Sequence, residues 1–455
     1  MAWNHAPIYK AAISAFLLLG CALPALAQTN RIAPPVPVAR QAQSVQPPVA
    51  PLAPAPSPPR EWTGEDGSSG HPLMKASAIR AAAANFESCV AGLYPLAAKR
   101  GVTRASFDKY TKDLTPDLRI MDLVDAQPEF TKAFWDYLDI LVNDARVQNG
   151  LEMLAKHKAT FDKVEKAYGV DRQIITAIWG VESNYGTLGG DRPVLRSTAT
   201  LACIGRRQAY FRDEFLSALE ILHRGDVRPE QLKGSWAGAF GPTQFMPTSF
   251  KRFAVDFDGD GRRDVVDSSA DMIASTANNL KKDGWVSGST WGYEVIIPKG
   301  FNYLQADRSH QKTMAEWQSL GIKRPGGKSF PRPDDRGYLL VPAGNQGPGF
   351  LMLHNFRVLM KYNPAEAYAL AIGHLSDRFR GGGAIEQPWP RHEPVLSRDE
   401  RRELQELLLS KGFDGGTPTG RLGPKARAAV RDYQASIGLV PDGFATATIL
   451  ARLRR

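Results

Sequence analysis

The chain has 455 residues, of which 43% are hydrophobic and 23% are charged, and its formal net charge at pH 7 is +10. This composition can fill a large core and a small one, which excludes an intrinsically disordered protein. The positive charge suits an anionic polymer such as a carboxylate-rich cell wall, but no run of five or more basic residues marks a nucleic-acid patch, so we expect no nucleic-acid partner.

Residues 1–27 have the pattern of a secretory signal peptide. Lys10 precedes an apolar stretch at 11–20, and the small residues of the Ala25–Ala27 segment fit a cleavage site. We favour simple cleavage, which places the mature protein in the periplasm. The Leu18–Cys21 segment also resembles a lipoprotein box, so an outer-membrane lipid anchor on Cys21 stays open as the alternative. No later stretch reaches the roughly 20 apolar residues of a membrane span, so no transmembrane span is expected after the signal peptide.

Residues 28–70 are predicted to form an extended, semi-rigid tether. Proline recurs with alanine and valine throughout residues 33–60. This composition favours polyproline-type backbone rather than a packed core. The sequence therefore places the first folded domain after the tether, at residues 71–383.

The 71–383 domain is predicted to be mostly helical. Apolar residues recur at helical spacing within residues 75–167 and again within residues 198–223. Short alternating apolar runs at 293–297 and 338–341 predict a small antiparallel sheet inserted among the helices. We expect helix again from residue 349 to residue 378.

Glu182 is a carboxylate on the apolar face of a predicted helix. Ile174, Ile178 and Glu182 recur at i, i+4 and i+8, so the carboxylate points the way the isoleucines point. With a helix stop at Gly186, it also lies at the negative end of the helix dipole. Both effects predict a raised pKa for Glu182 and a proton retained near neutral pH, as a general acid requires. A glutamate that turns to solvent at a frayed helix end is the alternative.

Residues 256–267 match the spacing of an EF-hand calcium loop, between predicted helices at 247–254 and 270–281. The predicted ligands are the side chains of Asp256, Asp258, Asp260, Asp264 and Asp267 and the carbonyl of Arg262. Carboxylates this close repel one another unless a cation holds them, so we expect a structural calcium ion. The last position is Asp267 rather than the usual glutamate, and an acidic surface turn without metal is the alternative.

The C-terminal part is predicted to be a separate small unit. Residues 384–395 have the composition of a linker, and residues 396–455 predict three short helices. Ser397 and Glu400 form a capping box, and Pro424 suits a first helical turn. After the signal peptide only Cys89 and Cys203 remain, and an even pair in an exported protein predicts a disulfide.

Four motifs occur in the order typical of the membrane-bound B type of lytic murein transglycosylases, which the chain resembles from about Phe86 to Gly382. They are the Glu182–Gly186 segment, the 235–247 stretch from Ser235-Trp236-Ala237-Gly238 to Gln244-Phe245-Met246-Pro247, the 256–267 loop, and Tyr362-Asn363. The tail similarly resembles a three-helix peptidoglycan-binding domain, departing from it at Leu422 and Tyr433.

The resemblance implies a mainly α protein: a lysozyme-like α+β catalytic domain with a small antiparallel β insertion and an EF-hand-like loop, plus a small three-helix domain. It implies cleavage of the β-1,4 bond between N-acetylmuramic acid and N-acetylglucosamine in peptidoglycan, with 1,6-anhydromuramoyl ends and no cofactor for catalysis. Glu182 matches the single catalytic acid. The matched groove residues are Ser235, Gln244, Tyr362, Asn363 and Tyr368. Arg206 and Tyr210, from the segment 206–210, are further candidates.

Two other functions stay open at this point. A hydrolytic muramidase would need a second carboxylate, Asp191 or Asp213, to place a water molecule. A non-catalytic wall-binding scaffold would keep the groove and the calcium loop, although an intact Glu182 argues against it. An assay for free reducing ends separates hydrolysis from transglycosylation.

Overall fold

The computed structural model describes residues 61–67, 69–124 and 132–455. The predicted signal peptide, Cys21 and most of the predicted tether lie outside the described residues. Within the described part of the chain, no helix is both long and apolar enough to cross a membrane.

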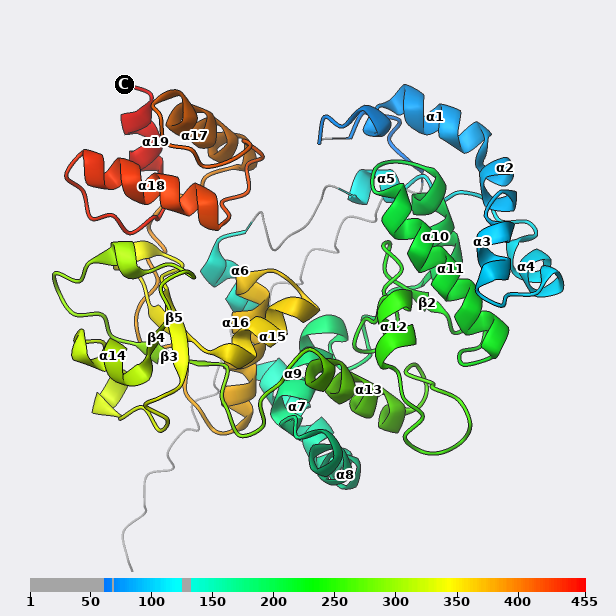
Figure 1. The fold of residues 1–455 in the computed structure, drawn as a ribbon, viewed down its shortest axis with the longest axis horizontal. Helices are drawn as coiled ribbons and strands as arrows, with labels where there is room; N and C mark the ends of the chain where they lie inside the picture. The colour runs from blue at the N-terminus through cyan, green and yellow to red at the C-terminus, as the bar shows by residue number, and fades with distance from the viewer. Residues whose placement is uncertain (1–60, 68, 125–131) are drawn as a thin grey trace, which may run out of the picture. The chain divides into compact units, whose positions relative to one another are not determined.

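Helices make up most of the fold (Figure 1). In chain order they are α1 (Ala76–Ala84), α2 (Phe86–Ala91), α3 (Tyr94–Lys99), α4 (Arg104–Thr111), α5 (Ile120–Leu123), α6 (Phe134–Leu141), α7 (Asp144–Lys156), α8 (Lys158–Tyr168), α9 (Arg172–Ser183), α10 (Val194–Cys203), α11 (Gln208–Arg224), α12 (Pro247–Phe253), α13 (Ser269–Lys282), α14 (Met314–Ser319), α15 (His354–Tyr362), α16 (Glu366–Phe379), α17 (Arg398–Ser410), α18 (Pro424–Ser436) and α19 (Ala447–Leu453).

Polar caps and glycines set several helix ends. The side chains of Thr103, Asn143 and Ser268 each accept a hydrogen bond from a backbone N–H in the first turn of α4, α7 and α13. Gly169 and Gly225 end α8 and α11 in the left-handed conformation, which glycine adopts without steric cost.

The largest core holds the helix on which Glu182 lies. The helix α9 packs against α16 and α7, and α10 packs along α11, which in turn contacts α12. Ile178 of α9 and Leu370 of α16 are both fully buried. Because α9 is covered on these sides, its C-terminal end is held in a fixed position.

The strands form two small antiparallel sheets. They are β1 (Arg192–Pro193), β2 (Lys233–Gly234), β3 (Gly292–Val295), β4 (Lys312–Thr313), β5 (Arg336–Leu340) and β6 (Gly349–Met352). The strands β1 and β2 pair with each other, and the other four have the order β3-β6-β5-β4, with Gly292 and Tyr338 both opposite Met352. Trp317 of α14 is fully buried in a second core beside this sheet. The predicted mainly helical fold with a small antiparallel insertion is confirmed.

Two predicted helical stretches are wrong in part. Residues 349–352 form β6 rather than helix, because this short apolar run is buried on both faces between β3 and β5, a pattern that periodicity cannot distinguish from a buried helix. Residues 198–223 are not continuous helix: the chain breaks between α10 and α11, where Gly205 and Arg207 both have positive φ.

The helices α17, α18 and α19 pack on one another around a third core that includes Leu404, Val430 and Leu450. Both hydrogen bonds of the Ser397–Glu400 capping box are present, so that prediction is confirmed.

Several contacts join these three helices to the rest of the described chain. Arg427 of α18 pairs with Glu366 at the start of α16, with N–O distances of 2.7 and 3.0 Å. Arg431 pairs with Asp307 at 2.6 Å. In the expected linker, Trp389 stacks on Phe134 with ring centroids 5.8 Å apart. Part of the 384–395 segment therefore packs against neighbouring side chains, while many of its other residues are exposed.

Candidate active site

Glu182 lies in the last turn of α9, whose inward-facing residues are buried. The Glu182 side chain is itself half-buried, and its Oε1 accepts a hydrogen bond of 2.6 Å from the Tyr368 hydroxyl. Tyr368 comes from α16 and is only 2% exposed. The structure thus brings these two predicted residues together, but it places Tyr368 behind the carboxylate rather than on the surface of a groove.

A second tyrosine stands near the same carboxylate. The Tyr362 hydroxyl donates a hydrogen bond to the carbonyl of Thr243. Burial, and then the negative charge of Glu182, raise the pKa of both Tyr362 and Tyr368 well above the ordinary value for tyrosine. Both phenols therefore stay protonated and act as hydrogen-bond donors around Glu182.

The turn after α9 is fixed by tight packing. Asn184 and Tyr185 both have positive φ, which is uncommon outside glycine. The Tyr185 hydroxyl donates to the carbonyl of Arg146 at 2.6 Å, and its ring lies over Gly180, where a Cβ would come within 2.6 Å of the phenol oxygen. Ser183 donates to the carbonyl of Pro242, which ties this turn to the glycine-rich segment.

Ser235 and Gln244 shape the glycine-rich segment. Ser235 Oγ accepts a hydrogen bond of 3.0 Å from the Ala239 backbone N–H, so this hydroxyl stabilises its own turn. Gln244 has positive φ, and its side-chain amide donates to the carbonyls of Gly189 and Gly241, both at 3.0 Å. The Gln244 side chain is therefore held between the turn after α9 and its own loop.

Gln244 and Tyr362 also line a pocket of about 330 Å³. Its wall carries cationic and amide side chains from α12, α13 and α15: Arg252, Asn279 and Lys361. Polar groups that converge in a pocket beside a half-buried carboxylate are typical of a substrate site.

The remaining predicted groove residues are placed differently. The Asn363 side chain accepts from the Ala365 N–H at 3.1 Å and so caps the turn before α16. Tyr210 is 41% exposed, the Arg207 guanidinium lies over its ring, and burial of its hydroxyl raises its pKa to about 12. Arg206 donates to the carbonyl of Val124 at 3.4 Å. These contacts tie the three residues to their own turns and to a neighbouring segment.

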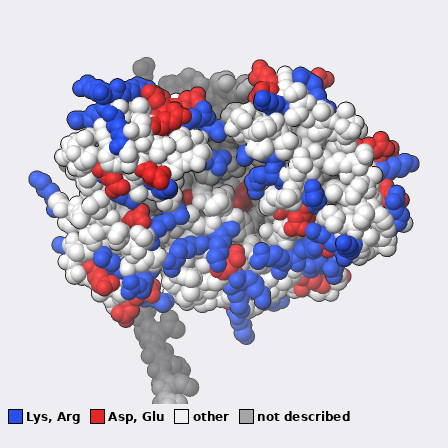
Figure 2. Space-filling model, turned by 45° about the horizontal axis from the view of Figure 1, so that its top comes forward, with Lys and Arg blue, Asp and Glu red and all other residues white. Residues whose placement is uncertain are grey.

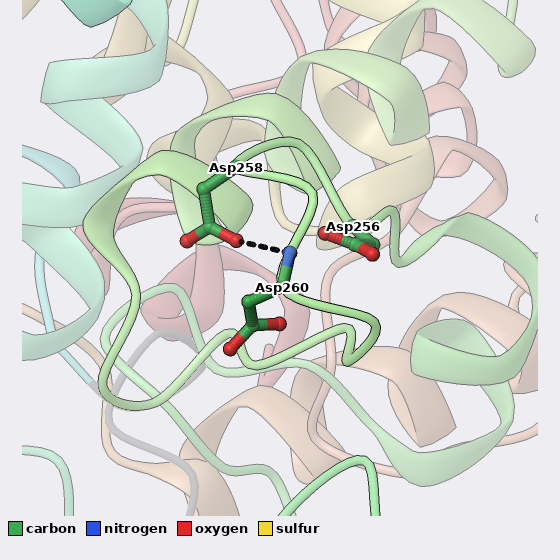
Figure 3. Close-up of side chains that lie close together, drawn as sticks. All are labelled: Asp256, Asp258 and Asp260. Carbon is green, nitrogen blue, oxygen red and sulfur yellow. Dashed lines mark hydrogen bonds between the residues drawn. The ribbon is translucent and has the colours of Figure 1, made fainter.

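Three carboxylates of the predicted calcium loop come together. Asp256, Asp258 and Asp260 each offer an oxygen within 4.8 Å of the others, and all three are exposed (Figure 3). Asp258 accepts a hydrogen bond of 3.3 Å from the Asp260 N–H, and Asp256 accepts from the N–H groups of Gly259 and Gly261. Side chains at positions 1, 3 and 5 of an EF-hand loop have this arrangement.

The later loop positions depart from the prediction. Asp267 is not part of the three-carboxylate group and instead pairs with Arg228 at 3.1 Å. Asp264 is 1% exposed, and its Oδ2 is a buried atom without a hydrogen bond, with the Arg262 guanidinium 3.6 Å away. The donor set of hard oxygens suits calcium.

Cys89 of α2 and Cys203 of α10 are bonded in the structure, with their Cα atoms 6.1 Å apart. The bond joins the N-terminal helices to the helix that precedes the Arg206–Tyr210 segment. It closes a loop with a sequence separation of 114 residues.

The sequence interpretation missed several positioning residues. Thr243 was not singled out, although it accepts the Tyr362 hydrogen bond. Nor was Asp271, which holds the calcium loop by accepting from the N–H groups of Phe257 and Asp264. Tyr185 falls within the Glu182–Gly186 motif, but the sequence interpretation gives it no role of its own. Its position directly after Asn184 and before Gly186, where a helix must stop, is the signal that could have found it.

The surface charge agrees with the composition. On the face shown in Figure 2, Lys and Arg side chains are spread widely and are interspersed with Asp and Glu, so this face carries no uninterrupted basic patch. A dispersed positive charge suits an extended polyanion more than a single docking site.

Comparison with known proteins identifies two families along the chain. The Transglycosylase SLT domain family matches residues 85–377, and the Putative peptidoglycan binding domain family matches residues 397–453. The chain is 31% identical over 251 residues to membrane-bound lytic murein transglycosylase B of Escherichia coli strain K12, an alignment that covers 53% of this chain and 66% of that protein. The chain thus spans slightly less than two thirds of this relative's length.

Solved structures extend the likeness over more of the chain. SltB3 from Pseudomonas aeruginosa, solved in complex with NAG-anhNAM-pentapeptide, is 43% identical, with a TM-score of 0.79, and the match covers 81% of this chain and 99% of that one. The Escherichia coli lytic transglycosylase Slt35, solved in complex with calcium, is 27% identical, with a TM-score of 0.54, covering 65% of this chain and 92% of that one.

Proposed function

Because this chain belongs to the transglycosylase SLT family, we propose that it is a lytic transglycosylase that cleaves the β-1,4 bond between N-acetylmuramic acid and N-acetylglucosamine in peptidoglycan. The predicted family and its lysozyme-like fold are confirmed by the match to SltB3. The observation that carries the proposed function is the half-buried Glu182 carboxylate, which accepts a hydrogen bond from Tyr368 inside the matched domain.

Glu182 is proposed to act first as acid and then as base. The protonated carboxyl gives its proton to the glycosidic oxygen, and the bond from that oxygen to C1 of the muramoyl residue breaks. The C6 hydroxyl oxygen of the same sugar then bonds to C1, and its proton returns to Glu182. The product is a 1,6-anhydro end and no water is consumed. Attack within one sugar has an effective concentration that free water does not reach.

The surrounding residues are proposed to position this step. Tyr368 orients the Glu182 carboxylate, while Tyr362 and Gln244 line the pocket in which the glycan would lie. Ser235 and Asn363 hold the turns that bring these side chains together. Arg206 and Tyr210 are proposed to extend the groove.

A hydrolytic reaction would need a second carboxylate to activate water. Asp213 is paired with Arg100, and Asp191 lies exposed in the turn ahead of β1. Because Asp213 is engaged by a cation and Asp191 lies in an exposed turn, we retain the one-carboxylate mechanism.

The test is a digest of purified sacculi with the wild-type chain and with Glu182→Gln, followed by mass analysis of the released muropeptides. Gln keeps the shape and removes the titrating proton, so release should fall by about 10²- to 10⁴-fold or more, with folding and wall binding preserved. Wild-type products should carry anhydro ends. Products with free reducing ends would indicate a hydrolase, and near-wild-type release by a folded Glu182→Gln protein would remove Glu182 from the mechanism.

We further propose that the 256–267 loop holds a structural calcium ion. Asp256, Asp258 and Asp260 would supply side-chain oxygens and Arg262 its carbonyl, and Asp267 would have to leave its pair with Arg228 to join them. The ion would neutralise carboxylates that otherwise repel one another. The calcium in the structure of Slt35 supports the proposal.

The proposed arrangement along the chain is a signal peptide (1–27), a tether (28–70), a catalytic domain (71–383), a short connection (384–395) and a peptidoglycan-binding domain (396–455). Export to the periplasm follows from the proposed signal peptide, with a lipid anchor on Cys21 as the alternative. The family match at residues 397–453 supports peptidoglycan as the partner of the last domain.

A further inference from the structure

A second pocket lies away from Glu182, where the start of α18 meets the start of α16. It has a volume of about 380 Å³. Its lining contains more cationic side chains than carboxylates. The cations are Lys132, Arg308, Arg401, Arg421 and Arg427, and the carboxylate is that of Glu366. Both families of the chain contribute to it, since Arg308 and Glu366 lie in the transglycosylase match and Arg401 and Arg427 in the other.

The carboxylate in this pocket is already used. Glu366 accepts from Arg308 at 2.6 Å and from Arg427 at 2.7 Å, and its side chain is only 9% exposed. Those two arginines therefore keep their own internal partner. Of the other cations, Arg401 has no anionic partner among the described residues, which leaves its positive charge for a ligand.

Arg401 is a buried cation that has no anionic partner among the described residues. The residue is 9% exposed, its Nε is buried without a hydrogen bond, and none of its guanidinium nitrogens has a hydrogen-bond or ion-pair partner among the described residues. The nearby charge is that of Arg398, which is also positive. An unpaired buried charge is costly, so a folded chain that keeps one here favours binding of an external anion.

The rest of the lining selects the kind of anion. Trp135, Leu396, Leu422 and Phe444 give the pocket an apolar wall beside the guanidinium groups. A small hydrated ion gains nothing from that wall, and a neutral sugar gains nothing from the unpaired charge. The pocket suits a ligand with carboxylates on a partly apolar backbone, such as a short peptide rich in alanine.

The pocket is also connected to the proposed active site through one segment. Pro364 and Ala365 line it, while Tyr362, two residues earlier, lines the pocket beside Glu182. Two residues of chain span at most about 7 Å, so a peptide carried by a glycan near Tyr362 would lie near the wall of the pocket that Arg401 also lines.

We propose that this pocket binds a carboxylate of the stem peptide that peptidoglycan carries on its muramoyl residues, with Arg401 as the recognising cation. The inference rests on the proposed function for the identity of the peptide. It assigns the pocket to substrate recognition and gives it no part in the chemical step.

The test is calorimetric titration of the full chain with the free stem pentapeptide and with the same peptide amidated at every carboxyl group. The wild-type chain should bind the acid form, and Arg401→Gln should weaken this binding about tenfold or more, since charge-assisted hydrogen bonds to a carboxylate are lost. The matched control is Arg402→Gln, the neighbouring arginine, which pairs with Asp399 on the surface and does not line the pocket. It should bind like wild type.

A second variant tests the pocket independently, in case Arg401→Gln does not fold. Val395 lines the pocket and is 45% exposed, so Val395→Glu should fold and should also weaken binding of the acid peptide by adding a negative charge. Equal binding of the acid and amidated peptides, or wild-type binding by both Arg401→Gln and Val395→Glu, would overturn the proposal. Displacement of the peptide by inorganic phosphate and by chloride alike, at the same ionic strength, would do so too, because the site would then accept anions in general.

Cleavage of a peptide-free glycan by the same proteins separates this inference from the proposed function. Arg401→Gln should release anhydro-ended products from it at the wild-type rate. If no preparation yields anhydro ends while peptide binding depends on Arg401, the proposed reaction fails and the pocket stands. If anhydro ends appear and the peptide does not bind, only the pocket assignment fails.

Discussion

At the scale of single residues, the decisive contact is the hydrogen bond from the Tyr368 hydroxyl to Glu182. It joins the end of α9 to α16 through two residues that are 186 positions apart in the sequence. A phenol that remains protonated is a reliable donor, and both burial and the charge of Glu182 keep Tyr368 in that form. The bond orients the carboxylate and stabilises its ionised form more than its protonated form.

We therefore expect Tyr368→Phe to retain some cleavage and to change its pH dependence. Without the donor, the protonated form of Glu182 becomes relatively more favourable, so the basic limb of the kcat/KM profile should move to higher pH while the rate at the optimum falls about tenfold or more. The measurement is a pH–rate profile on a soluble glycan.

Tyr110→Phe is the control for this prediction, because it removes a phenol that donates its hydrogen bond elsewhere, to the carbonyl of Leu222 in α11. Its profile should match wild type. An unchanged profile in Tyr368→Phe would mean that the phenol only fills space.

At the scale of elements, the 256–267 loop depends on neutralising its own charge. Three exposed carboxylates lie within 4.8 Å of one another, and the loop connects α12 to α13. Its backbone is held partly by Asp271, so the loop has a preformed shape. A cation should therefore stabilise the two helices more than it changes their positions.

We expect calcium to raise the melting temperature of wild type above that in chelator, with a smaller effect of magnesium. A ligand that binds only the folded state adds about 2.7 kcal/mol at roughly a hundredfold excess over Kd. Since Asp267 is shorter than glutamate and is paired with Arg228, Kd should lie around 10⁻⁴ to 10⁻³ M. The double variant Asp258→Ala, Asp260→Ala is the control, and a calcium shift of equal size in it would show that the ion binds elsewhere.

The Cys89–Cys203 disulfide is a second feature that acts between elements, because it links α2 to α10. Closing so long a loop restricts the unfolded chain, so reduction should lower the free energy of unfolding by about 2 to 4 kcal/mol. If the chain is exported and processed as proposed, thiol titration of the unfolded, unreduced mature protein should find no free thiol. Two titratable thiols would contradict the bond in the mature protein.

At the scale of the whole molecule, the C-terminal helices share a buried ion pair with the domain that carries Glu182. Burial raises the pKa of the Glu366 carboxyl, but the charges of Arg427 and Arg308 outweigh burial and hold this pKa below its ordinary value of 4.5. A carboxyl with a lowered folded-state pKa stabilises the fold above the unfolded-state pKa, and that stability is lost as pH falls through the lower value.

Arg427→Met should therefore destabilise the chain most at neutral pH, by about 3 kcal/mol, because Glu366 keeps only Arg308. The difference from wild type should shrink below about pH 4.5, where the carboxyl becomes protonated in the variant. Thermal melts across pH measure both effects. Lys425→Met is the matched control on the same helix: its pair with Asp414 is more than 60% exposed, so its loss should cost little at any pH.

The same contact bears on the division into domains. Removing the chain after Gln387 would delete Arg427 together with the Trp389 stack, so a truncated protein loses buried contacts as well as wall binding. A point variant separates the two effects where a truncation does not. A pH-independent loss in Arg427→Met would show that its role is packing rather than charge.

Features that depend on local sequence patterns could be predicted from the sequence alone. Helical spacing placed Glu182 on the buried side of α9, the Ser397–Glu400 box marked the start of α17, and the ordered motifs identified the family. Local patterns failed where neighbours decide: residues 349–352 became a strand because β3 and β5 flank them.

Contacts between residues far apart in the sequence became clear only from the tertiary structure. It placed Tyr368 behind Glu182, turned Asp267 toward Arg228, and left Arg401 buried without an anion beside a cationic pocket. Each of these depends on side chains brought together across tens to hundreds of residues by packing of the core. Periodicity and motif spacing describe a residue's own element and carry no information about what packs against it.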